Sequence, residues 1–339
     1  MRTIQSSDRV AFSSSLLIGI LLMGILVSST GSAGITAASN FAPDARQQAE
    51  TSALQGKIEE LIKASGAETV AVAYHDFAND KELLINPDAS FHAASTMKVP
   101  VMMEIFRQVA AGKLTLNQRI PVKNDFASIV DASHYSLTPD SDSDQSLYAR
   151  IGQTETIREL MRLMIIVSSN LATNILIERV TPQRVMELMQ AIGADHIRVL
   201  RGVEDGKAFQ QGLNNTTTAR DLMIILRRIA ERRAVSGKAS DEMISIMLAQ
   251  KFNEGIPAGL PRNVLVSHKT GSITKINHDA AIVYPRSRKP YVLVVLTRGI
   301  EDEKLAHKLI ENISRVVYQH CRAQDKDRVP KAHQITFGP

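Results

Sequence analysis

The chain has 339 residues, of which 44% are hydrophobic, and a single cysteine, Cys321. One cysteine excludes an intrachain disulfide and a zinc site built on cysteines, so packing must supply the stability. The formal net charge of +5 is spread out, without the basic and aromatic clusters typical of nucleic-acid binding, and the histidines lack metal-ligand spacing, so we expect no nucleic acid, no metal and no cofactor.

The first 38 residues have the plan of a secretory signal peptide. Arg2 and Arg9 precede the apolar run 16–27, and small residues follow it, with candidate cleavage sites after Ala33 and after Ala38. A single membrane anchor is the alternative, but the run is shorter than the roughly 20 residues that span a bilayer. We therefore expect an exported protein, periplasmic or secreted, without a stable membrane anchor after cleavage.

The two ends of the mature chain are predicted to form a sheet. Residues 45–65 have the apolar spacing of an amphipathic helix, and two strands, over 69–77 and 82–86, follow it. Strands are predicted again over 264–268, 280–284 and 291–297, before a last helix over about 302–320. The polar tail over 326–339 is expected to be loose.

Helices are predicted for most of the chain between these strands. One runs from Thr154, its N-cap, to Val167, another starts after Thr217 or Thr218, and a third covers 241–249. The simplest packing is a mixed α/β fold, with one antiparallel sheet of about five strands flanked by helices and an inserted all-helical lobe.

This packing predicts the domain limits. One domain covers 39–325, with a sheet lobe at about 45–90 plus 226–320 and a helical lobe at about 91–225. A cleft between two such lobes is a common place for a small-molecule site.

Ser95 and Lys98 are the first candidate catalytic residues. They lie three positions apart at the start of a predicted helix, so we expect the lysine amine to reach the serine hydroxyl. The hydroxyl needs a partner that takes its proton, and a lysine serves only when burial or nearby cations lower its pKa. The pair indicates serine acyl transfer, although Ser-x-x-Lys alone recurs by chance on solvated helix faces.

Two further motifs follow in the chain. Ser168-Ser169-Asn170 comes directly after a predicted helix, and Lys269-Thr270-Gly271-Ser272 comes at the end of a predicted strand. Singly, each has an ordinary structural interpretation, as a helix cap or as a strand ending in a turn. Together with Ser95 and Lys98 they match, in order, the signature of class A β-lactamases and penicillin-binding proteins.

The chain therefore resembles the class A β-lactamases and the similar serine hydrolases of that superfamily, over about residues 50–320. The segments 153–160, 170–176 and 216–219 are similar to the family's helices on either side of the second motif and to the segment after its Ω-loop. The resemblance implies the serine β-lactamase-like fold. It also implies hydrolysis of the cyclic amide of penicillins and cephalosporins, and so antibiotic resistance and β-lactam catabolism, by an enzyme expected to be a monomer.

Four residues have catalytic roles by this resemblance. Ser95 attacks the lactam carbonyl and forms an acyl-enzyme, and Lys98 holds or accepts the proton of the serine. Ser168 relays a proton to the leaving nitrogen, and Glu204 activates the water that releases the acyl group.

Five residues are assigned to substrate binding on the same ground. Lys269 attracts the substrate carboxylate and Thr270 binds it, and Asn170 binds the amide of the substrate's side chain. The strand residues Gly271 and Ser272 complete the site, and the N–H of Ser272 joins that of Ser95 in an oxyanion hole.

The glutamate is the weakest match. Glu204 lies about where the family's Ω-loop glutamate falls, but Asp205 replaces the usual next proline and Ala208 the usual asparagine. Asp205 is therefore a rival candidate. A structural ion pair between Glu204 and a loop arginine is the other alternative.

Three more departures affect the site. Ser169 stands where the family usually has an aspartate, and His278 stands about where many members have an arginine that steers the substrate, so carboxylate binding is weaker or depends on Arg298. The chain also has extra length over 138–146, which is expected either to border the mouth of the site near Tyr135 or to be a disordered surface insertion.

Two other functions stay open. A D-alanyl-D-alanine peptidase or an esterase of the same superfamily would acylate Ser95 but differ in how the acyl group leaves. A non-catalytic ligand-sensing or wall-binding module would form no adduct with penicillin.

Overall fold

The computed structural model describes residues 42–328, so the predicted signal peptide and most of the predicted tail lie outside the described residues. Contacts delimit a compact unit from Arg46 onward, and the fold below is that of this unit. Among residues 42–328, no helix combines the length and the apolar character that crossing a bilayer requires.

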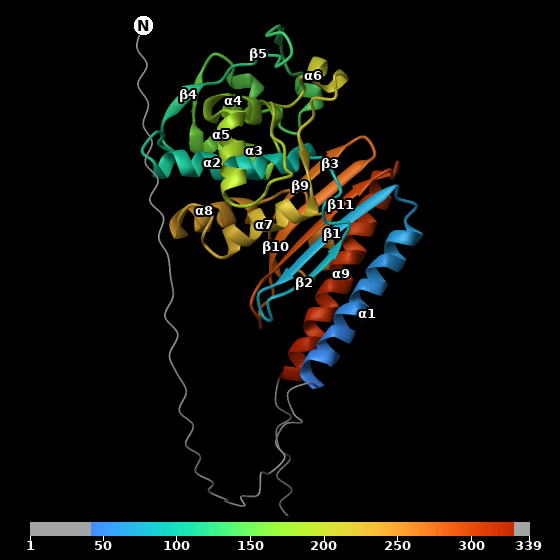
Figure 1. The fold of residues 1–339 in the computed structure, drawn as a ribbon. Coiled ribbons are helices and arrows are strands. Elements are labelled where there is room, and N and C mark those ends of the chain that lie inside the picture. The colour runs from blue at the N-terminus through green and yellow to red at the C-terminus, as the bar shows by residue number, and fades with distance from the viewer. Residues whose placement is uncertain (1–41, 329–339) are drawn as a thin grey trace, which may run out of the picture. The chain divides into compact units, whose positions relative to one another are not determined.

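The centre of the fold is a five-stranded antiparallel sheet, in the order β2-β1-β11-β10-β9 (Figure 1). Its strands come from both ends of the chain, as predicted: β1 (Thr69–Asp76), β2 (Lys81–Ile85), β9 (Leu265–Ile273), β10 (Ile276–Tyr284) and β11 (Tyr291–Arg298). Because β9 is an edge strand, half of its N–H groups are not used by β10 and face the neighbouring segment.

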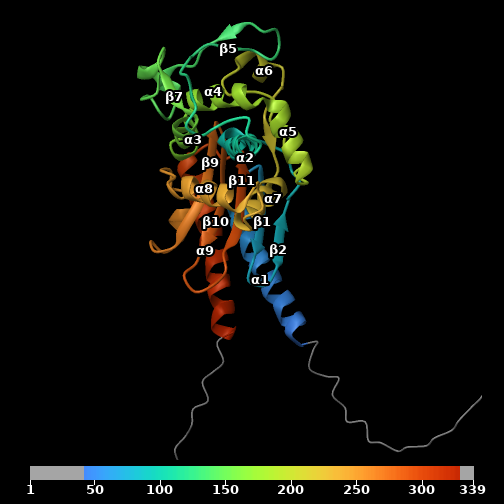
Figure 2. The same ribbon diagram turned by 90° about the vertical axis from the view of Figure 1, so that its left-hand side faces the viewer.

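The central strands are buried on both faces, since helices cover each side. Alternate residues of β1 enter different cores: Val70 and Val72 pack with Leu54 and Ile58 of α1 (Ala42–Ala64), together with α9 (Glu303–Arg328). Ala71 and Ala73 point to the other core, where α7 (Ala219–Ala230) contacts β1, β10 and β11. Figures 1 and 2 show α1 and α9 side by side along one face of the sheet.

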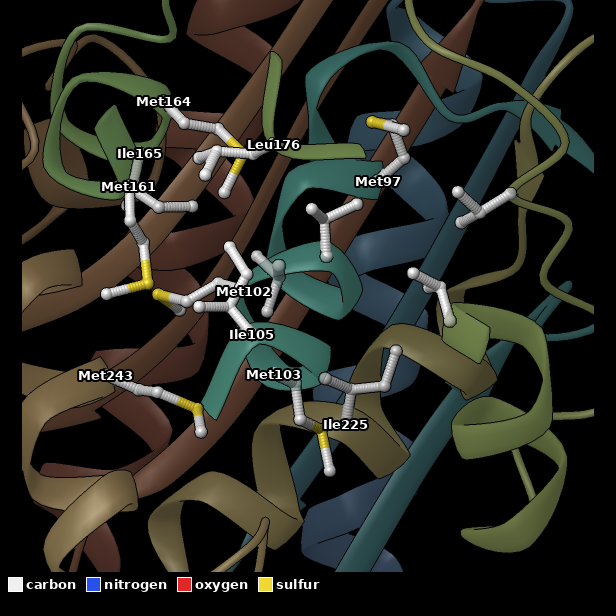
Figure 3. Packing of buried hydrophobic residues seen from close by; sticks show 14 of the residues in the cluster. Met97, Met102, Met103, Ile105, Met161, Met164, Ile165, Leu176, Ile225 and Met243 are labelled. Atoms are coloured by element: carbon white, nitrogen blue, oxygen red, sulfur yellow. The ribbon is translucent and has the colours of Figure 1, made fainter. Parts of the chain in front are cut away.

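The helical lobe surrounds α2 (Lys98–Ala110), which packs against its neighbours on every side. These neighbours are α3 (Ile157–Ile166), α4 (Asn170–Val180), α5 (Pro182–Ala191) and α8 (Gly237–Leu248). Figure 3 shows that methionines, among them Met102, Met103, Met161 and Met243, fill much of this core. The chain has no tryptophan, and unbranched methionine adapts well to irregular gaps.

Short elements connect the helices of this lobe. Within the described residues, three two-stranded ribbons join β3 (Phe91–His92) to β8 (Thr216–Thr217), β4 (Arg119–Pro121) to β7 (Thr154–Thr156) and β5 (Phe126–Ala127) to β6 (His134–Tyr135). Single turns of 3-10 helix and a short α-helix complete the list: η1 (Ala94–Met97), η2 (Pro139–Ser141), η3 (Tyr148–Arg150), η4 (Ile256–Gly259) and α6 (Gly206–Gln210).

Several predicted boundaries are wrong. The strand predicted over 280–284 begins at Ile276, the helix predicted over 241–249 begins at Gly237, and the last helix continues to Arg328. The helix predicted from Thr154 starts at Ile157, because residues 154–156 pair with β4, and Thr156 is the N-cap that accepts from the N–H of Glu159. The strand predicted over 264–268 continues to Ile273, because β10 pairs with it along its whole length. The Lys-Thr-Gly motif therefore lies inside a strand, which holds its backbone straight beside η1.

Candidate active site

Ser95 lies on η1, between two cavities. The preceding Ala94 has a positive φ of 45°, and the serine is half-buried and lines both hollows. One cavity of about 500 Å³ extends toward Asn170 and Glu204, and the other, of about 190 Å³, extends toward Thr270 and α9. If a substrate carbonyl were bound at Ser95, one of its two substituents would therefore lie in each cavity.

Lys98 is fully buried directly behind Ser95. Its Nζ donates to Ser168 O at 2.6 Å, to Asn170 Oδ1 at 2.9 Å and to Ser168 Oγ at 3.1 Å. Burial lowers the pKa of Lys98 to about 7, against the opposing effect of the Asp142 and Glu204 carboxylates. Near neutral pH the amine is therefore free of its proton part of the time, as a general base must be.

Among residues 42–328, Lys98 Nζ makes no hydrogen bond to the predicted partner, the Ser95 hydroxyl. In the described part of the chain, the acceptors of Lys98 Nζ belong to Ser168 and Asn170 instead. The local spacing is not the cause, since side chains three positions apart on a 3-10 turn still share a face. The amine points to Ser168 and Asn170 because these residues, distant in the chain, supply its acceptors.

Ser168 connects the two buried lysines. Its Oγ lies 3.1 Å from Lys98 Nζ and 3.0 Å from Lys269 Nζ, and its backbone has a positive φ of 58°. Burial, and then the charge of Lys98, hold the pKa of Lys269 well below its usual value. A hydroxyl between two amines of lowered pKa can take a proton from one and pass it on, and strained backbone is often found at such sites.

Asn170 and Glu204 face the larger cavity. Asn170 Oδ1 accepts from Lys98, and its Nδ2 lies 3.5 Å from Glu204 Oε1. Both residues line the cavity of about 500 Å³ that also contains Ser95. The structure therefore brings the predicted glutamate to the same hollow as the predicted nucleophile.

The two alternatives for Glu204 fail. Asp205 is buried, accepts from Ser128 Oγ and from two backbone N–H groups, and is the N-cap of α6, so its carboxylate is used structurally. Arg201 donates to Leu213 O, Gly202 O and Asn214 Oδ1, so within the described part of the chain its guanidinium has hydrogen-bond partners other than Glu204.

Asn174 is a positioning residue that the sequence analysis missed. Its Oδ1 accepts from Val203 N at 2.6 Å and its Nδ2 donates to Val203 O at 3.0 Å, which fixes the backbone directly before Glu204. A side chain on Gly202 would collide with this amide. A buried asparagine within the apolar helix α4 was the available signal, because such an amide needs partners.

The Lys-Thr-Gly strand lies against the turn that carries Ser95. A Cβ on Gly271 would lie 3.0 Å from Ser95 N and 3.1 Å from Thr96 N. Ser272 Oγ lies 2.9 Å from Asn277 Oδ1 and 3.0 Å from Glu303 Oε1, so acceptors hold its side chain on the side of α9.

Gly271→Ala is expected to slow acylation about 10- to 100-fold, because the methyl group must separate β9 from η1 and so disturb oxyanion donors on both. The measurement is the rate of adduct formation with a fluorescent penicillin. Gly56→Ala is the control, since a Cβ there meets no atom within 4 Å. Equal rates for Gly271→Ala and the wild type would contradict this close packing.

His278 does not serve as a cationic substitute for an arginine. It is buried, its Nε2 lies 2.9 Å from His92 O, and its Nδ1 is within 3.3 Å of the N–H of Thr297, so the backbone engages both ring nitrogens. Burial lowers the pKa of His278 to about 4, so it is neutral at pH 7. Arg298 pairs with Glu68 at 3.0 Å and does not line either cavity.

Acid is expected to destabilise the fold through His278. Its folded pKa of about 4 lies below the unfolded value of 6.5, so the unfolded chain binds the proton first and stability is lost as the pH falls from about 6.5 to 4. The loss is about 3 kcal/mol at most. Urea unfolding between pH 7.5 and 4 measures it, and His278→Asn should flatten the dependence. An unchanged slope in that variant would contradict this assignment.

The segment 138–146 borders the site, as one of the two interpretations predicted. Ser141 and Ser143 line the larger cavity, and Ser143 also lines the smaller one. Tyr135 lies nearby, with its hydroxyl donating to Val203 O at 3.2 Å. Among residues 42–328, no group of three or more His, Cys, Asp or Glu side chains is arranged to hold a metal ion.

Comparisons with known proteins agree with this geometry. The sequence model of the Beta-lactamase enzyme family matches residues 53–321. β-Lactamase Toho-2 of Escherichia coli is 29% identical over 79% of this chain and 89% of its own length, and β-lactamase VEB-1 of Pseudomonas aeruginosa is 24% identical over 80% and 91%.

Solved structures give the same result. The structure of PBP-A has a TM-score of 0.69 and 26% identity over 80% of this chain and 96% of its own. An ancestral class A β-lactamase has a TM-score of 0.69 and 25% identity over 78% of this chain and 99% of its own.

Proposed function

The chain belongs to the beta-lactamase enzyme family, and on that premise we propose that it is an exported class A β-lactamase that opens the ring of penicillins and cephalosporins through an acyl-enzyme on Ser95. The observation that carries the proposal is the Ser168 hydroxyl held between the amines of Lys98 and Lys269. Ser95 lines the smaller cavity together with Ser168 and the larger cavity together with Glu204. The catalytic domain proposed for this activity is 39–325, acting as a monomer.

In the acylation step, Ser95 Oγ attacks the lactam carbonyl while its proton passes to the neutral amine of Lys98, which must turn from Ser168 and Asn170 toward the hydroxyl to accept it. The N–H groups of Ser95 and Ser272 donate to the oxyanion. When the C–N bond breaks, Ser168 gives its proton to the leaving nitrogen and is reprotonated by Lys98. The close approach of β9 to η1 supports the pairing of these two N–H donors.

In the deacylation step, Glu204 takes a proton from a water molecule, which attacks the acyl carbonyl. Ser95 Oγ leaves and recovers a proton, so that water has been added across the amide. Asn170 supports this role, since its amide lies between Lys98 and Glu204 in the cavity that would contain the substrate's acyl side chain. Thr270, which lines the smaller cavity, binds the substrate carboxylate there, and the buried Lys269 next to it in the chain attracts it.

A penicillin-binding peptidase is the second candidate, and the backbone of Glu204 is the observation that favours it. Glu204 has a positive φ of 62°, and its carboxylate accepts only from Asn170, at 3.5 Å, within the described residues. A carboxylate held so loosely would activate water slowly and leave a long-lived adduct.

One experiment separates the candidates: nitrocefin turnover by the purified mature protein, with intact-mass spectrometry of a penicillin reaction over time. We expect turnover with a short-lived adduct. An adduct that lasts for hours would favour the peptidase, and no adduct at all would contradict both. N-terminal sequencing of the protein from a periplasmic extract tests export, with a start at Gly34 or Ser39 as the expected result.

A further inference from the structure

The segment 138–146 places a buried carboxylate at the start of α4. Asp142 is 7% exposed, and its Oδ1 accepts from Asn170 N at 2.9 Å. Its Oδ2 accepts from Leu171 N at 2.9 Å and from Tyr148 Oη at 3.0 Å. Asp142 therefore binds this segment to the helix that carries Asn170.

Asp142 completes the capping of α4. An α-helix begins with N–H groups that have no partner in the helix itself. Asp142 accepts from the first two, at Asn170 and Leu171, and the Ser169 side chain accepts from the third, at Ala172. A carboxylate at this end is also favoured by the helix dipole. The serine at position 169 carries no charge, so the charge at this helix start comes from residue 142.

The same helix start holds Lys98. Asn170 donates its N–H to Asp142 and accepts from Lys98 Nζ through Oδ1 at 2.9 Å. Lys98 also donates to Ser168 O, two residues earlier. A displacement of the first turn of α4 would thus move two of the acceptors that orient the amine.

Three charged groups act on Lys98 from the elements packed around it. The carboxylates of Asp142 and Glu204 favour its protonated form, and Lys269 on β9 opposes it. On its own helix, Glu104 is paired with Arg107. Of Asp142 and Glu204, only Asp142 is buried and held by several hydrogen bonds. Its negative charge therefore stays at a fixed position relative to the amine of Lys98.

We propose that Asp142 is a positioning residue of the acylation step: its carboxylate holds the start of α4, and through it Asn170 and Lys98, and it places a fixed negative charge near the amine of Lys98. The inference rests on the proposed function, because it concerns the base of that reaction. The segment 138–146 then contributes to the catalytic centre through its buried residue Asp142, and not through the exposed residues that line the cavities, such as Ser143.

Three variants of the mature protein separate the effect of the Asp142 charge from the effect of its side-chain length and hydrogen bonds. Asp142→Asn removes the charge and presents an amide to the helix start. Asp142→Glu keeps the charge on a longer side chain. Asp144→Asn is the matched control, since Asp144 is also buried in the segment but, among residues 42–328, its side chain accepts only from Ser146.

Two measurements are made on each variant between about pH 5.5 and 9. The first is the titration of Lys98 by NMR of lysine-labelled protein, with the signal assigned by its loss in Lys98→Arg. The second is the rate of adduct formation with a fluorescent penicillin. The NMR titration needs no turnover, so it remains informative if the proposed function fails.

In Asp142→Asn we expect the titration midpoint of Lys98 to fall by about half a pH unit or more, since removing a nearby negative charge favours the neutral amine. The acid limb of the acylation profile should move with it, while the plateau rate falls about tenfold because the acceptors are displaced. Asp142→Glu should keep the wild-type midpoint with a reduced rate. Asp144→Asn should match the wild type in both.

An unchanged titration midpoint and an unchanged acylation rate in Asp142→Asn would overturn the inference. A lower melting temperature with an unchanged midpoint would also overturn it, because that result would show a purely structural role for Asp142. If Asp142→Asn does not fold, Asp142→Glu decides, because an unreduced acylation rate there contradicts the positioning role. A wild type that forms no adduct, with a midpoint that still moves in Asp142→Asn, refutes the proposed function and leaves the charge coupling established.

Discussion

Ser95→Ala is expected to lower kcat/KM for nitrocefin about 10⁴-fold or more and to abolish the covalent penicillin adduct. The variant removes the only atom on η1 that can form the acyl bond in the proposed mechanism, while the oxyanion donors and the cavities remain. Because the change deletes one half-buried oxygen, the melting temperature should stay within a few degrees of the wild-type value.

The measurement combines steady-state turnover with intact-mass spectrometry after incubation with penicillin. Ser143→Ala is the control, since this exposed serine lines both cavities and has no proposed chemical role. If Ser95→Ala still gained the mass that penicillin adds to the wild type, another residue would be the nucleophile. That result would refute the proposed mechanism at its first step.

Glu204→Gln is expected to stop the reaction after acylation. The amide cannot take a proton from water, and loss of a general base typically costs 10²- to 10⁴-fold, so kcat should fall by about 10³-fold. The acylation rate should change by less than about tenfold, because Asn170 lies between Glu204 and the groups proposed for acylation, Lys98 and Ser168. The penicillin adduct should then persist and become countable by mass.

Rapid mixing separates the two steps: a stoichiometric burst of nitrocefin opening, followed by almost no turnover, is the predicted trace. Glu178→Gln is a suitable control, since Glu178 lies on α4 and pairs with Lys123 outside the cavities. A variant that deacylates at the wild-type rate would remove Glu204 from the mechanism and leave the identity of the water-activating group to be found.

The sheet was predictable because its signals are local. The apolar runs over 69–77, 280–284 and 291–297 indicate strands, and the five-stranded antiparallel sheet was confirmed. Element boundaries were less predictable: Thr154 joins β7 and not a helix, since its pairing with Pro121 depends on a strand distant in the chain.

The acid–base partners of the site could not be predicted in the same way. The i, i+3 spacing suggested that Lys98 contacts Ser95, but its three hydrogen bonds go to Ser168 and Asn170. His278 was read as a partial cation, and burial makes it neutral. Both errors have one source: charge and hydrogen bonding depend on burial and on residues far away in sequence.

By itself, the sequence determined which chemistry to propose for this protein, because a serine, two lysines and an asparagine in ordered motifs are a local property and their residue types admit few reactions. Only the tertiary structure decided which groups control that chemistry. Asp142 reaches α4 from an insertion, Asn174 fixes the backbone before Glu204, and Asp205 is used as a helix cap. No spacing rule predicts such contacts, because chain folding alone sets the distance between segments that are remote in sequence.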